Sequence, residues 1–201
     1  MTLFITFEGP EGSGKSTVMQ AIAERLNQPL ITTREPGGIR ISEAIRELLL
    51  SDDNLMDART EALLFAASRR QHLVERVLPA LEEGKLVLCD RFIDSSLAYQ
   101  GYARGLGADA IMDINRFAIE EHMPDLTLYL KVAPEIGLSR INDNARATNR
   151  LDKESLAFHQ LVCEGYDYLA EQYDRIVTID AARPIADVIE SAYQVILDKM
   201  K

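Results

Sequence analysis

The sequence predicts an α/β fold, with a five-stranded parallel sheet flanked by helices on both faces. Five short apolar runs alternate with segments of helical periodicity along the whole chain, as in successive β–α units. The chain has 201 residues, of which 47% are hydrophobic and 27% charged, a composition ordinary for a globular protein. This length suits one domain with a sizeable core, so we expect residues 1–201 to form a single domain.

The five expected strands are mainly apolar runs, each followed by polar, proline or glycine residues. The run at 86–89 is apolar throughout, which is typical of a central parallel strand covered on both faces. The expected strands are 3–7, 30–33, 86–89, 126–130 and 176–179.

Helical periodicity fills the segments between these runs. Ser42 is expected to cap a short helix that ends at Leu50. Thr60 is expected to open a longer helix, in which Pro79 marks a kink or the end. The other helices are expected at about 18–26, 95–102, 109–121, 134–141, 153–172 and from 184 onward.

The stretch after the first strand has the G-x-x-x-x-G-K-S spacing of a phosphate-binding loop, between a predicted strand and a predicted helix. Its glycines let successive backbone N–H groups turn toward phosphate oxygens, and the helix N-terminus adds partial positive charge. Lys15 is expected to reach the β- and γ-phosphates, and the Ser16 hydroxyl to ligate Mg²⁺. The residues expected to bind the nucleoside triphosphate here are Gly9, Pro10, Glu11, Gly12, Ser13, Gly14, Lys15, Ser16 and Thr17.

Charged residues follow other strand ends at the same edge of the sheet. Asp90 ends an apolar run, and a carboxylate in that position holds Mg²⁺ directly or through water. Arg34 and Arg91 also follow strand ends, and several guanidinium groups at such ends indicate two phosphate-bearing ligands rather than one. Arginines expected to be solvated surface charges are Arg40, Arg59, Arg104 and Arg183.

Several classes of function are excluded. The net charge of −10 argues against a nucleic-acid surface, and no apolar run approaches the length of a membrane span. The D-x-x-G and N-K-x-D motifs of signalling GTPases do not occur. Cys89 and Cys163 have no metal-binding spacing, and the first strand leaves no room for a signal peptide, so we expect reduced thiols and a cytoplasmic location.

Besides the phosphate loop, the sequence contains two segments that are typical of one family. Residues 33–38 read Thr-Arg-Glu-Pro-Gly-Gly, and residues 90–101 contain Asp-Arg-Phe followed by Ser-x-x-Tyr-Gln-Gly. With these in register, the chain closely resembles the thymidylate kinase family over nearly its whole length. The resemblance implies a P-loop nucleoside monophosphate kinase-like fold and a homodimer. It also implies transfer of the γ-phosphoryl group of ATP to dTMP with Mg²⁺, in dTTP biosynthesis.

The resemblance also implies an acceptor site for dTMP. The residues implied to hold its phosphate are Arg34, Arg46 and Arg91. The residues implied to contact the thymine are Phe65, stacked on the base, and Arg69, Ser96 and Gln100 along its edge. Tyr99 would crowd the sugar 2′ position, and Glu11 would accept a hydrogen bond from the 3′-hydroxyl.

A polar segment at about 142–153 is expected to form a mobile lid. Because the variable positions of the phosphate loop are not basic, Arg146 and Arg150 are expected to bring positive charge from outside, as in bacterial members of the family. Arg146 is expected to contact ATP. The expected catalytic residues are therefore Lys15, Arg91 and Arg150.

Two other functions remain open from the sequence. One is a nucleotide or nucleoside kinase with the same sheet and a different acceptor pocket. Arg69 and Gln100 favour thymine, whose edge needs a donor at O4 and an acceptor for N3–H. The other is a nucleotide-dependent binding or regulatory protein without turnover.

Overall fold

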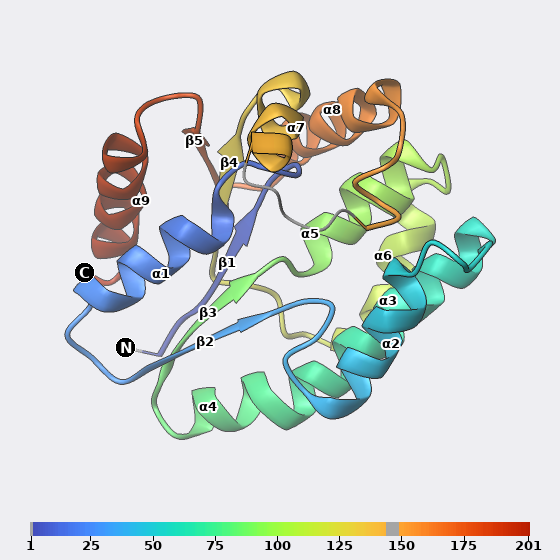
Figure 1. Cartoon of the computed structure of the whole chain (residues 1–201). Coiled ribbons are helices and arrows are strands. Elements are labelled where there is room, and N and C mark those ends of the chain that lie inside the picture. The colour runs from blue at the N-terminus through green and yellow to red at the C-terminus, as the bar shows by residue number, and fades with distance from the viewer. Residues whose placement is uncertain (1, 144–148) are drawn as a thin grey trace.

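A parallel sheet forms the centre of the computed structural model, which describes residues 2–143 and 149–201 (Figure 1). The strand order is β2-β3-β1-β4-β5. The strands are β1 (Phe4–Glu8), β2 (Leu30–Arg34), β3 (Leu86–Asp90), β4 (Leu126–Lys131) and β5 (Ile176–Asp180). The predicted fold class is confirmed, and each strand ends one residue later than predicted.

Alternate residues of the central strands pack on opposite faces of the sheet. Phe4 of β1 packs among one group of helices, and Ile5 and Phe7 pack among the other. One face is covered by α3 (Ala58–His72), α6 (Ala108–Ile119) and α8 (Leu156–Gln172). The other face is covered by α1 (Lys15–Arg25) and α9 (Ile185–Lys199), which lie together in Figure 1.

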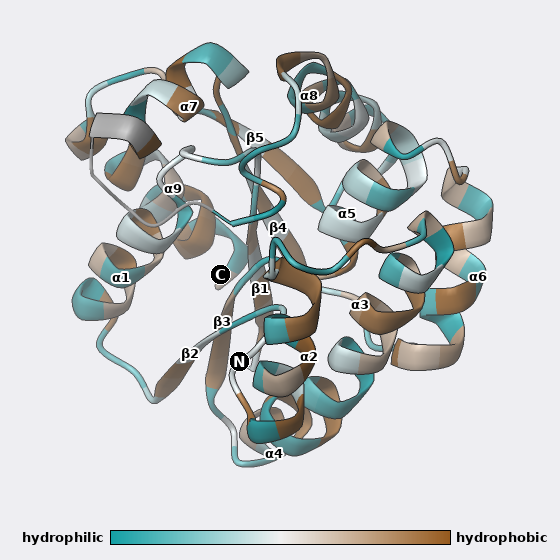
Figure 2. Cartoon of the chain, turned by 45° about the vertical axis from the view of Figure 1, so that its right-hand side comes forward, coloured by the Kyte–Doolittle hydropathy of each residue, from teal (hydrophilic) through white to brown (hydrophobic). Residues whose placement is uncertain are grey.

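Four further helices and two π-helical segments complete the described elements. They are α2 (Arg40–Leu50), α4 (Leu78–Glu82), α5 (Ile93–Ser96) and α7 (Pro134–Asp143), with π-helical segments η1 (Leu73–Val77) and η2 (Leu97–Ala103). Helices α2, α3 and α6 are neighbours, because α3 contacts both of the others. Brown, hydrophobic residues are visible along all three in Figure 2.

Helix starts differ from the sequence-based predictions. Helix α2 begins at Arg40, so Ser42 lies inside it rather than at its cap, and its hydroxyl donates to Ser68 O at 2.8 Å. Helix α3 is capped by Asp57, whose carboxylate accepts from the backbone N–H groups of Arg59 and Thr60. Both differences arise because helical periodicity locates the buried face of a helix more sharply than its first residue.

Pro79 does not end the long helical stretch. It lies in the first turn of α4, which continues directly from the preceding helical segments. The π-helical segment η1 joins α3 to α4. No helix within 2–143 or 149–201 is long and apolar enough to cross a membrane.

Candidate active site

The phosphate loop between β1 and α1 folds around the amino group of Lys15. This group donates to the carbonyl oxygens of Gly9 and Pro10 at 3.1 and 2.9 Å, and to Ser13 Oγ at 3.2 Å. Gly12 has a φ of 71°, and a Cβ there would lie 2.0 Å from the carbonyl oxygen of Gly137. Burial, followed by the charge of Arg91, lowers the pKa of Lys15 to about 8. The amino group is therefore charged at neutral pH and stands where an anion would stabilise it.

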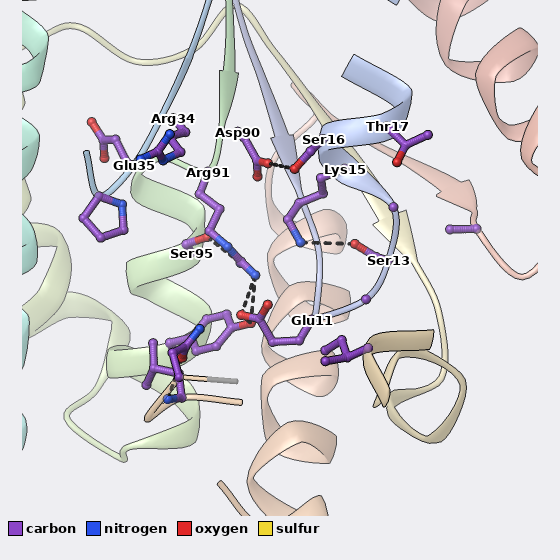
Figure 3. A pocket seen from close by; sticks show the side chains of 18 of the residues that line it. Glu11, Ser13, Lys15, Ser16, Thr17, Arg34, Glu35, Asp90, Arg91 and Ser95 are labelled. Carbon is purple, nitrogen blue, oxygen red and sulfur yellow. Dashed lines mark hydrogen bonds and ion pairs between the residues drawn. The ribbon is translucent and has the colours of Figure 1, made fainter. Parts of the chain in front are cut away.

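Ser16 and Asp90 meet beside the loop, as Figure 3 shows. The Ser16 hydroxyl donates to Asp90 Oδ2 at 2.6 Å. A hydroxyl oxygen and a carboxylate oxygen are the hard ligands that Mg²⁺ prefers, and Mg²⁺ usually takes one or two protein ligands together with substrate phosphates. The donor set therefore fits the predicted metal.

Arg91 directly follows Asp90 at the end of β3 and has a φ of 71°. Its guanidinium group contacts Glu11 Oε1 at 2.7 Å and donates to Gly9 O and Ser95 Oγ, both at 3.1 Å (Figure 3). Burial alone would lower the pKa of Arg91, but the charge of Glu11 and other nearby acidic groups raises it well above its usual value. Arg91 therefore stays charged and directed at the loop.

The buried carboxylate of Glu8 shares hydrogen-bond partners with Arg91. Glu8 accepts from Phe92 N at 2.7 Å, from Ser95 Oγ at 2.6 Å and from the Tyr166 hydroxyl at 2.8 Å. The same two hydroxyl groups also bond Arg91. Burial, followed by the charge of Asp94, raises the pKa of Glu8 to about 7. Sequence reasoning missed Glu8, although an acid at the end of an apolar strand was a usable signal.

Arg34 and Arg46 line the same cavity as Arg91. Arg34 pairs with Glu43 at 2.7 Å, and Arg46 donates to Pro36 O at 2.9 Å. Burial, followed by the nearby charge of Arg34, lowers the pKa of Arg46. Three guanidinium groups on one wall suit a phosphate dianion.

Five of the residues predicted to contact the nucleoside line this cavity: Glu11, Phe65, Ser96, Tyr99 and Gln100. Arg69 lies behind the wall instead, 1% exposed. It pairs with Glu35 at 2.8 Å and donates to Ser96 Oγ at 3.0 Å. Arg69 thus bonds a residue that lines the cavity, and its predicted contact with thymine stays a prediction.

Arg150 lies on the acceptor side, away from the phosphate loop. Its guanidinium group donates to Leu49 O at 2.9 Å and pairs with Glu61 at 2.5 Å. Arg146 and residues 144–148 of the predicted lid lie outside the described residues. The catalytic role of Arg150 stays a prediction, and in this conformation the side chain serves as an anchor.

The cavity measures about 530 Å³ and continues past the phosphate loop. Beyond the loop it is bordered by Arg140, Ala181, Arg183, Ile185 and Val188. Sequence reasoning missed this end, because these residues form no motif and come together only where α7 and α9 approach the loop. Of the arginines that we expected to be solvated, Arg183 is exposed and also lines the cavity, whereas Arg104 pairs with buried Glu61.

The fold and the site together define a P-loop kinase. Residues 11–17 of the phosphate loop line a cavity that also reaches Phe65 and Gln100 on one hand and Ile185 and Val188 on the other. Arg34, Arg46 and Arg91 line the same cavity, as a phosphorylated acceptor requires.

Known proteins agree with this class. The family model described as "Thymidylate kinase" matches residues 7–192. The thymidylate kinase of Bacillus cytotoxicus is 59% identical over 98% of both chains, and that of Clostridium novyi is 61% identical over 93% of this chain and 94% of its own. The crystal structure of the thymidylate kinase of Ehrlichia chaffeensis superposes with a TM-score of 0.79 at 32% identity, covering 97% of this chain and 98% of the other. The chain belongs to the thymidylate kinase family.

Proposed function

We propose that this chain transfers the γ-phosphoryl group of ATP to dTMP, giving dTDP and ADP as a step toward dTTP. The observation that carries this function is the cavity that the phosphate loop lines together with Arg34, Arg46 and Arg91. Phosphoryl transfer asks the protein mainly to align two anions and neutralise the charge between them. An acceptor phosphate is already ionised at neutral pH, so no general base is needed.

The donor half of the site holds the triphosphate. Backbone N–H groups of residues 11–17 surround its phosphates, and Lys15 reaches the transferring group. Ser16 and Asp90 would hold Mg²⁺, which would neutralise charge on the phosphates of ATP. The end of the cavity bordered by Ile185 and Val188 receives the base of ATP.

The acceptor half holds dTMP. Arg34, Arg46 and Arg91 bind its phosphate. The nucleoside contacts are Phe65 stacked on thymine, Ser96 and Gln100 on its edge with Arg69 behind them, Tyr99 at the 2′ position and Glu11 at the 3′-hydroxyl.

The lid over about 142–153 closes this site. We propose that Arg150 ties the described end of the lid to the acceptor side through Glu61. The transferring phosphoryl group is then left to Arg146, together with Lys15 and Arg91.

A coupled assay of ADP release tests the proposed reaction. With Mg²⁺ and ATP present, we expect dTMP to stimulate ADP release at least about 10²-fold over ATP alone, since alignment with an acceptor supplies much of the rate. Slow release of ADP regardless of acceptor would indicate a regulatory protein, and preference for another nucleotide would indicate a different kinase.

We also propose a homodimer and a cytoplasmic location. The dimer is supported by exposed apolar side chains on three adjacent helices: Leu48 of α2, Leu63 of α3 and Phe117 of α6 are 52, 56 and 91% exposed. The location is supported by Cys89 and Cys163, which are both free.

A further inference from the structure

A buried carboxylate lies directly behind the base-binding end of the cavity. Glu61 of α3 is 1% exposed, and its Oε1 accepts a hydrogen bond from Gln100 Nε2 at 2.9 Å. Gln100 is equally buried and lines the cavity. Glu61 itself is not among the residues that line it. Any effect of Glu61 on the acceptor therefore passes through the Gln100 amide.

Two arginines keep Glu61 ionised. Arg150 contacts its Oε2 at 2.5 Å, and Arg104 contacts its Oε1 at 3.3 Å. Burial alone would raise the pKa of Glu61, but the hydrogen bonds from Gln100 and Arg150 and the charge of Arg104 outweigh it and lower the pKa. An ionised carboxylate can only accept hydrogen bonds.

The ionised state of Glu61 decides which way the Gln100 amide faces. An amide carries a donor on one side and an acceptor on the other, and either orientation fits the same space. Because Glu61 only accepts, the amide must direct its NH₂ group at Glu61. Its oxygen is then left for the cavity, and within the described residues that oxygen has no hydrogen-bond donor.

We propose that Glu61 is a specificity-determining positioning residue, which holds the Gln100 amide with its oxygen toward the acceptor base. This inference rests on the proposed function, in which Gln100 meets the edge of a pyrimidine. A 4-oxo pyrimidine such as thymine carries a donor at N3 and pairs with that oxygen. A 4-amino pyrimidine such as cytosine carries an acceptor at N3 and would leave two acceptors facing each other, which is costly in a buried site.

The test compares kcat/KM for dTMP with kcat/KM for dCMP at a fixed concentration of ATP. Glutamine at position 61 can donate as well as accept, so in Glu61→Gln the Gln100 amide is free to turn over. We expect the dTMP-to-dCMP ratio to fall by about tenfold or more, with an unchanged KM for ATP. The matched control is Glu154→Gln, which removes the other carboxylate on Arg104 and leaves the partner of Gln100 intact. We expect this control to keep the wild-type ratio.

A second pair of variants guards against misfolding. Glu61→Gln deprives Arg150 of its carboxylate, and a charge left unpaired in a partly buried site can prevent folding. The double variant Glu61→Gln/Arg150→Gln removes both members of that ion pair and is compared with Arg150→Gln alone. We expect the dTMP-to-dCMP ratio of kcat/KM to be lower in the double variant than in Arg150→Gln, by the same factor of about tenfold or more.

Equal losses of kcat/KM for dTMP and dCMP would overturn the proposal, because a purely structural role of Glu61 affects both acceptors alike. A fall in the ratio that persists in a Gln100→Leu background would also overturn it, because the effect would then bypass Gln100. If the wild type does not phosphorylate dTMP at all, the proposed function fails, a result distinct from an unchanged ratio.

Discussion

Lys15 and Arg91 both donate a hydrogen bond to the carbonyl oxygen of Gly9, each at 3.1 Å. Both side chains are largely buried, and their positive charges therefore converge on one turn of the phosphate loop. A phosphoryl group passing over that turn lies within reach of both cations. At the scale of single residues, these two positive charges can stabilise the negative charge of the transferring phosphoryl group.

The pKa of Lys15 gives a prediction about pH. Because the pKa is lowered to about 8, Lys15 is charged below that pH and loses its charge as the pH rises through it. ATP favours the charged form, so its affinity should fall above pH 8, by up to about tenfold per pH unit from this one group. Calorimetric titration of ATP between pH 7 and 9.5 measures the effect. A Lys15→Arg control stays charged and should give a flatter profile, whereas equal slopes in both proteins would contradict the assignment.

Residue roles were predictable where a local motif carries them. The spacing of residues 9–16 predicts a phosphate loop, because phosphate binding needs these residue types along one continuous stretch of chain. Glu61 carries no such signal. Its importance comes from three partners 39 to 89 positions away in sequence, and only the packing of α3 against η2 and the segment after α7 brings them together.

At the scale of elements, the predicted strands were accurate and the helix ends were not. Buried strands are continuous apolar runs, which can be read directly from the sequence. Helix starts depend on backbone hydrogen bonds that several residue types can satisfy, which is why Asp57 caps α3 and Ser42 caps nothing. The position of the Arg150 side chain could not be predicted either, because its partners Leu49 and Glu61 lie in α2 and α3, far from it in sequence.

Arg150→Ala tests whether this arginine anchors the acceptor side. Its loss removes an ion pair and a hydrogen bond to α2, so we expect the KM for dTMP to rise several-fold, while the turnover rate falls by less than about tenfold. Steady-state kinetics with each substrate varied in turn provides the measurement. If turnover instead fell by about a hundredfold or more while the KM for dTMP stayed unchanged, Arg150 would act on the transferring phosphoryl group rather than as an anchor.

At the scale of the whole molecule, α/β alternation predicted the sheet, but sequence reasoning did not find the donor half of the cavity. Ile185 and Val188 belong to an ordinary amphipathic helix, and only the strand order brings α9 next to the phosphate loop. The exposed faces of helices are also hard to predict from the sequence. An exposed apolar residue cannot be told from a buried one until the neighbouring helices are placed.

Phe117→Glu tests the proposed dimer. Phe117 is 91% exposed on α6, so a charge at this position costs an isolated chain little. In a symmetric interface it would place two carboxylates in an apolar contact, and we expect the dimer to dissociate. Light scattering coupled to size-exclusion chromatography gives the mass directly. The matched control is Ile185→Glu, which adds the same charge on α9, away from α2, α3 and α6, at a residue 50% exposed. Dissociation by both variants, or by neither, would contradict this interface.

The central claim is that one cavity holds two phosphate-bearing nucleotides end to end across the phosphate loop. A compound that joins adenosine and thymidine through a chain of phosphates tests it most directly, by calorimetric titration with Mg²⁺ present. We predict one compound bound per chain, an affinity at least about 10²-fold above that of ATP alone, and loss of binding for both ATP and dTMP once it is bound. An affinity no greater than that of ATP, with dTMP still able to bind, would contradict the claim.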